Sequence, residues 1–149
     1  MKKVVISLFI ILLIAAGIGA YLWNKPHRTA EDEEPFVTLT ASALFTEFAT
    51  DEPATTAKYS DKVIQISGDL IKASADSSGN VQVVLEAGGE MNTVSVTLMK
   101  GATTPSETPG TKIDVKGICN GFMAGDLLGG ELLGGEVLLN QGVVVHQTK

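Results

Sequence analysis

The clearest indication of the fold comes from the segment Lys62-Val63-Ile64-Gln65-Ile66-Ser67-Gly68-Asp69-Leu70-Ile71-Lys72-Ala73. The apolar residues Ile64, Ile66 and Leu70 have the same parity, which is the pattern of a strand with one buried face. A glycine inside a strand favours a bulge or a sharp coil, of the kind that barrel strands need. We therefore expect residues 62–73 to form the first strand of a small β-barrel.

Four further segments show the period of two that is typical of strands, and turn residues separate them. These segments cover residues 81–86, 92–99, 112–122 and 137–146. Apolar and polar residues alternate most regularly in the third expected strand, so we expect one of its faces to be buried and the other to be exposed to solvent. In the fourth, Cys119 shares the parity of Ile113 and Val115, which predicts a buried thiol. The five segments together predict a mainly β fold, a small five-stranded barrel of the OB type.

A five-residue unit is repeated in tandem between the last two expected strands, as Asp126-Leu-Leu-Gly-Gly followed by Glu131-Leu-Leu-Gly-Gly. The unit is far too short to be a solenoid repeat. We interpret it as a loop that local duplication has expanded. Its four leucines either fold back onto the end of the barrel or form an interaction surface.

Two short helices are expected before the barrel. Thr40 is expected to cap the first helix, whose apolar face carries Phe45 and Phe48. Asp51 is expected to cap a second helix of residues 54–59, with a proline in its first turn. We expect the two phenylalanines to fill the hydrophobic core rather than to stack on a ligand.

The N-terminal segment Val4–Trp23 has no formal charge. A helix of that length spans roughly 30 Å, the thickness of the hydrocarbon core of a bilayer. We predict that residues 1–23 are a retained single-pass membrane anchor. The alternative is a cleaved signal peptide, which would leave a secreted product. Because the tail before the segment is very short, we expect the rest of the chain to lie outside the cytoplasm.

Residues 24–37 are polar and acidic, with two prolines and too little apolar content for a core. We interpret them as a linker between the anchor and a domain of residues 38–147. The acidic run Glu31–Glu34 is expected to be a solvated spacer rather than a cation-binding patch.

Three stretches resemble, in their order and spacing, the small bacterial OB-fold domains known as tRNA-anti-like. They are Ala57–Gly68, Lys116-Gly117-Ile118-Cys119-Asn120-Gly121 and Val137-Leu138-Leu139. The chain departs from the pattern at Ser60-Asp61, where a more basic pair is expected, and in the leucine-glycine insertion. The resemblance implies kinship in fold with anticodon-binding OB domains, and it places the expected anchor in a bacterial cytoplasmic membrane with a periplasmic domain. A fold by itself does not carry a function across.

The charge distribution argues against nucleic-acid binding. OB folds that bind oligonucleotides combine a basic groove with stacking aromatic side chains, and the second and third expected strands contain no lysine, arginine or aromatic residue. The net charge is -6, and removing Lys2 and Lys3 leaves 9 basic against 17 acidic residues. Because each phosphate contact calls for a cation, we predict that the domain does not bind nucleic acid.

No pattern in the sequence identifies a reaction. His27 and His146 lie at opposite ends of the polar part of the chain, and no phosphate-binding loop or nucleophile motif is present. Cys119 has no histidine near it in sequence to activate it, and one cysteine does not make a zinc site. We predict no catalytic, cofactor-binding or metal-binding residues.

The expected function is that of a membrane-anchored, non-enzymatic binding module whose ligand is a protein or another cell-envelope component. Its candidate surface is the outer face of the second and third strands with the leucine-rich loop: Gln82, Val84, Thr93, Ser95, Thr97, Leu127, Leu128, Leu132 and Leu133. The alternatives are a nucleic-acid-binding OB domain and a structural subunit of the cell envelope.

Overall fold

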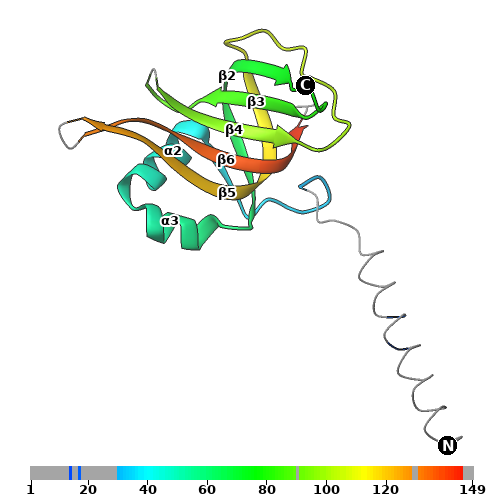
Figure 1. Cartoon of the computed structure of the whole chain (residues 1–149), viewed down its shortest axis with the longest axis horizontal. Helices are drawn as coiled ribbons and strands as arrows, with labels where there is room; N and C mark the ends of the chain where they lie inside the picture. Colours follow the sequence, from blue (N-terminus) through cyan, green and yellow to red (C-terminus); the bar gives the residue numbers. More distant parts are fainter. Residues whose placement is uncertain (1–13, 15–16, 18–29, 90, 129–130, 146–149) are drawn as a thin grey trace, which may run out of the picture.

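The computed structural model describes residues 14, 17, 30–89, 91–128 and 131–145 (Figure 1). The elements are β1 (Val37–Thr40), α2 (Ala41–Thr50), α3 (Glu52–Tyr59), β2 (Val63–Ala75), β3 (Val81–Glu86), β4 (Asn92–Leu98), β5 (Lys112–Leu128) and β6 (Glu131–Val145). Apart from Ile14 and Gly17, the predicted anchor Val4–Trp23 lies outside the described residues. Within these ranges, the structure has no helix that is both long enough and apolar enough to cross a membrane.

Five strands close into a barrel. The strand order is β1-β2-β3-β4-β6-β5, and an additional antiparallel pairing between β2 and β5 completes the ring. The ring pairs are antiparallel except for β4 with β6, which run parallel. This arrangement confirms the predicted five-stranded barrel, because its strands correspond one to one with the five segments of period two.

The strand β2 takes part in both halves of the barrel. Its first part pairs with β5, and from Leu70 onward it pairs with β3. The register shifts between Leu70 and Lys72, so the bulge lies there rather than at Gly68. Gly68 instead permits a close approach, since a Cβ atom at this position would lie 3.0 Å from the Cβ of Ala41 and 3.2 Å from that of Leu85.

The two helices begin where the caps predict. The Thr40 hydroxyl accepts a hydrogen bond from the Ala43 N–H at 3.2 Å, and the Asp51 carboxylate accepts one from the Ala54 N–H at 3.0 Å. These bonds satisfy N–H groups that a helix start leaves without an intrahelical partner. Both cap predictions are therefore confirmed.

The helix α2 contributes its apolar face to the barrel core. Phe45 and Phe48 are buried, and both contact the ring of Phe122 with 5.6 Å between ring centroids. Cys119 is 1% exposed and belongs to the same core. The predictions that the two phenylalanines fill the core and that the thiol is buried are confirmed.

Two elements differ from the sequence-based expectations. The strand β1 pairs in parallel with β2 from Val37↔Ile64 to Thr40↔Ser67, where no strand was predicted. The tandem repeat is a β-hairpin rather than a loop, because Asp126 pairs with Leu133 and Leu127 with Leu132. Antiparallel pairing gives ladder partners to the backbone groups of residues 126–128 and 131–133, which a loop would leave to solvent.

Candidate functional site

The outer face of β3 and β4 brings the predicted strand residues together. Gln82 lies opposite Thr97, Val84 opposite Ser95, and Glu86 opposite Thr93. Directly opposed residues of an antiparallel pair project to the same side of the sheet. Gln82 and Thr97 are exposed, while Val84 and Thr93 are half-buried. We call the patch formed by Gln82, Val84, Glu86, Thr93 and Thr97 the β3–β4 face.

Ser95 does not belong to the accessible part of this face, contrary to the prediction. Its side chain is 2% exposed, and its hydroxyl donates a hydrogen bond to the Glu136 carboxylate on β6. The alternation of residues along β4 correctly predicts the side of the sheet on which Ser95 lies. It did not reveal that a side chain from the next strand covers this position. Ser95 therefore links β4 to β6 instead of offering a contact to a ligand.

The leucines of the repeat lie on the hairpin, beyond the end of β4. Their backbones are paired through Leu127↔Leu132 and Asp126↔Leu133 in the β5–β6 ladder. The side chains of the four predicted residues, Leu127, Leu128, Leu132 and Leu133, are outside the described part of the chain. Their proposed contact role stays a prediction.

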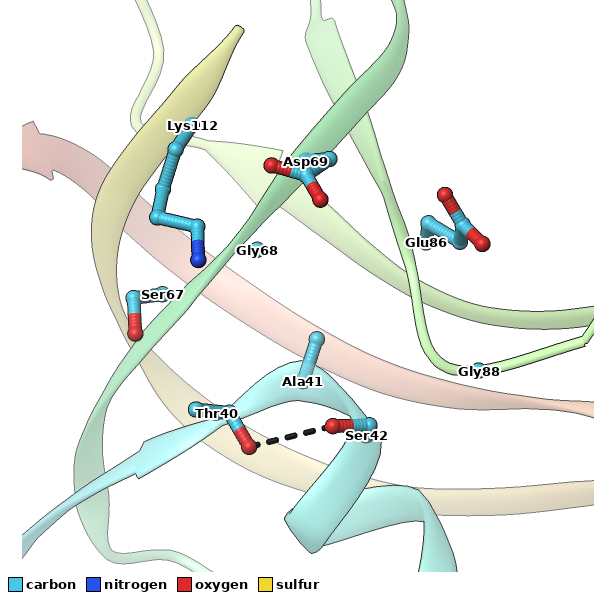
Figure 2. Close-up of a pocket in the computed structure, with 9 residues that line it drawn as sticks. All are labelled: Thr40, Ala41, Ser42, Ser67, Gly68, Asp69, Glu86, Gly88 and Lys112. Carbon is cyan, nitrogen blue, oxygen red and sulfur yellow. Dashed lines mark hydrogen bonds between the residues drawn. The ribbon is translucent and has the colours of Figure 1, made fainter. Parts of the chain in front are cut away.

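A polar pocket opens beside the β3–β4 face, and sequence reasoning did not find it (Figure 2). The pairing of β2 with β1 ends at Ser67, and its pairing with β3 begins at Leu70, which leaves a notch along Gly68 and Asp69. The pocket has a volume of about 210 Å³ and is lined by Thr40, Ala41, Ser42, Ser67, Gly68, Asp69, Glu86, Gly88 and Lys112.

The pocket combines hydroxyl groups with charges of both signs. The hydroxyls of Thr40 and Ser42 are 3.1 Å apart and hydrogen-bonded. Figure 2 shows the Lys112 ammonium on one side of the pocket and the Glu86 carboxylate on the other, with Asp69 between them. Such a lining suits a small polar ligand that both donates and accepts hydrogen bonds.

The pocket and the β3–β4 face meet at Glu86, which belongs to both. The lining residues come from β1, α2, β2, β3, the loop after β3 and β5, so no local sequence motif predicts the pocket. Only the topology brings them together, and the one available signal was the mid-strand Gly68.

The buried Cys119 thiol is a poor nucleophile. Burial raises the pKa of the Cys119 thiol to about 11, which disfavours the thiolate that a cysteine nucleophile needs. Within the described ranges, no group of three or more histidine, cysteine, aspartate or glutamate side chains is placed to hold a metal ion.

The molecule is therefore a small OB barrel with a polar face and an adjoining pocket. The family model described as tRNA_anti-like matches residues 1–129. The chain belongs to the tRNA_anti-like family, as the resemblance predicted. No curated protein matches the chain.

Among solved structures, the chain is similar to a candidate nucleic acid-binding lipoprotein from Klebsiella pneumoniae subsp. pneumoniae. The two are 10% identical, with a TM-score of 0.49, and the match covers 73% of this chain and 91% of that one.

Proposed function

We propose that this chain is a non-enzymatic binding module, held at the bacterial cytoplasmic membrane by Val4–Trp23, with its barrel on the periplasmic side. We further propose that the β3–β4 face binds a protein or another cell-envelope component. The chain's membership of an OB-fold family and the closed barrel support the binding role, because OB folds bind ligands on these strands.

The charge on the β3–β4 face is the observation that carries this proposal. Thr93 lies opposite Glu86 on β3 and opposite Glu136 on β6, so carboxylates flank it on both sides. Among the described residues, Lys72 on β2 lies opposite Val84 on β3, and Lys112 lines the pocket that meets the face at Glu86. Two separate cations beside the Glu86 and Glu136 carboxylates do not make the basic track that a phosphate backbone requires. The hydroxyl and amide groups of Gln82 and Thr97 instead favour a protein or glycan surface.

A titration with fluorescent single-stranded DNA and RNA at low salt tests the choice of ligand class. We expect no saturable change in anisotropy at micromolar protein, because polyanion binding is strongest at low salt. Saturable micromolar binding that weakens with added salt would establish the nucleic-acid alternative in place of our proposal.

Photo-crosslinking in intact cells tests the face itself. A photoreactive amino acid at the exposed Thr97 is expected to give discrete adducts. The same amino acid at Ser77, which is exposed in the β2–β3 turn, serves as the matched control and is expected to give none. Equal adducts from both positions would refute the assignment of the face, and one stoichiometric neighbour at every position would indicate a structural subunit.

Cell fractionation tests the location. We expect the full chain in the membrane fraction and its barrel accessible to protease in spheroplasts. A chain that partitions with the soluble cytosolic proteins, or a barrel digested only after lysis, would contradict the proposed anchor and orientation.

A further inference from the structure

Lys116 ties the segment before β1 to the outside of the barrel. Its ammonium donates hydrogen bonds to the backbone carbonyls of Glu31 at 3.1 Å and Glu33 at 2.8 Å. Lys116 reaches them from the outer side of β5, because its neighbour Val115 points into the core and is fully buried. Charge-assisted hydrogen bonds of this kind are stronger than neutral ones. Two carbonyls from one turn therefore hold this segment on the β5 wall.

The next residues continue the attachment. The Phe36 N–H donates to the Val63 carbonyl at 2.7 Å, and β1 then pairs with β2 through Thr40. The Phe36 ring also contacts Tyr59 edge-on, with 6.5 Å between ring centroids. The folded domain thus begins near residue 30, within the range interpreted from sequence as a solvated linker. In Figure 1, the blue segment before β1 makes a turn beside the barrel.

We infer that the contacts made by Lys116 and β1, which we call the strap, orient the barrel at the membrane. The β5 wall then faces the bilayer and the β3–β4 face points away from it. The β3–β4 face can therefore meet a partner from the aqueous phase. This inference rests on the proposed membrane anchor. In the ring of strands, β5 neighbours β2 and β6, which places β3 and β4 across the barrel from it.

The length of the free tether decides the orientation. With residues 30–37 strapped, six residues (24–29) remain between anchor and barrel, and they span at most about 20 Å. Without the Lys116 contacts, twelve residues (24–35) would be free, because the Phe36 N–H still bonds to the Val63 carbonyl, and they would span about 40 Å. A domain of this size is roughly 35 Å across, and the path around half its circumference is roughly 55 Å. The twelve-residue tether therefore lets the barrel turn much further from this orientation than the six-residue tether does.

Proteolysis of the full chain tests the strap without reference to a membrane. A glutamate-specific protease is expected to cut at Glu31–Glu34 about tenfold faster in Lys116→Met than in the natural chain, because local opening controls cleavage. Lys116→Arg keeps donors at this position and is expected to restore protection in part. Lys112→Met removes a positive charge from the same strand without touching the segment, and it should cleave like the natural chain. Equal cleavage of all variants would overturn the strap.

Energy transfer to a lipid-bound acceptor tests the orientation in liposomes that carry the full chain. A dye is placed at Thr38→Cys on β1 or at Thr97→Cys on β4, both exposed positions, while the buried Cys119 stays unlabelled. We expect strong transfer from position 38, weak transfer from position 97, and a rise at position 97 in Lys116→Met but not in Lys112→Met.

Liposome flotation precedes this measurement and separates the two proposals. A chain that floats but shows equal transfer from both dyes refutes the orientation, while the anchor stands. A chain that does not float refutes the anchor and the orientation with it, and the protease assay then decides whether the strap exists.

Discussion

Gly68→Ala should destabilise the barrel through one added methyl group. The new Cβ would lie 3.0 Å from the Cβ of Ala41, 3.2 Å from the Cβ of Leu85 and 3.4 Å from the Glu86 carbonyl oxygen. The two Cβ atoms belong to a helix start and a core strand, so they cannot rotate away as the end of a long side chain can. Overpacking of this kind typically costs 1–3 kcal/mol, and we expect about 2 kcal/mol.

Thermal unfolding of the full chain, followed by circular dichroism, measures this cost. A loss of about 2 kcal/mol lowers the Tm of a domain of this size by roughly 8 °C. Ser67→Ala, one residue earlier on β2 and half-buried, is the matched control and should lie within about 0.5 kcal/mol of the natural chain.

A double-mutant cycle identifies the clash. Ala41→Gly removes the closer Cβ atom and by itself should cost up to about 1 kcal/mol of helix stability. In the Gly68→Ala/Ala41→Gly variant, the destabilisation should be smaller than the sum of the two single effects, because the two atoms no longer meet. Strict additivity, or a Gly68→Ala variant as stable as the natural chain, would refute the close approach as the reason for this glycine.

Cys119, Glu47 and Thr40 each allow one further prediction. Cys119, with its pKa raised to about 11 by burial, should react with a thiol reagent at pH 8 about 100-fold more slowly in the native chain than in urea. Hydrogen bonds from Lys58 and Tyr59 lower the pKa of Glu47 below its ordinary 4.5. These bonds therefore stabilise the folded state above pH 4.5, and their contribution is lost as the pH falls through the lowered pKa. Below pH 4.5, the Tm of Glu47→Gln should therefore depend on pH less steeply than the Tm of the natural chain. The difference should be small, because the Glu47–Lys58 pair is partly exposed. Thr40→Ala should cost about 1 kcal/mol in thermal unfolding and Thr40→Ser much less, because serine keeps the cap.

The five barrel strands could be predicted because alternation is a local property. Each of them has one face in the core, so Ile64, Val94 and their equivalents recur every second residue. The strand β1 is different. Its four residues also alternate, but a stretch so short does not separate a strand from the approach to a helix cap. Within the part of the chain that the structure describes, it pairs only with β2, more than twenty residues later.

The hairpin and the pocket are two features that the sequence pattern does not predict. A tandem repeat between two strands suggests a loop expanded by duplication, yet residues 126–128 pair with residues 131–133 across the hairpin. The pocket needs Thr40, Ser67 and Glu86 from three separate elements, and nothing in the spacing of these residues brings them together. The sequence pattern therefore predicts which side of each strand faces solvent, as for Gln82. It does not predict which side chains a neighbouring strand covers, as for Ser95.

The fold and the pocket depend on the same few backbone positions. Thr40 ends β1 opposite Ser67, caps α2 and lines the pocket, while Gly68 lets α2 approach closely enough to form one wall. Changes at these two positions would alter the barrel and the pocket together. Lys112 and Glu86 are exposed, and they set the charge of the pocket while lying outside the core. We therefore expect substitutions at Lys112 and Glu86 to change the charge of the pocket at little cost in stability, so that they would separate an effect on the proposed binding from an effect on folding.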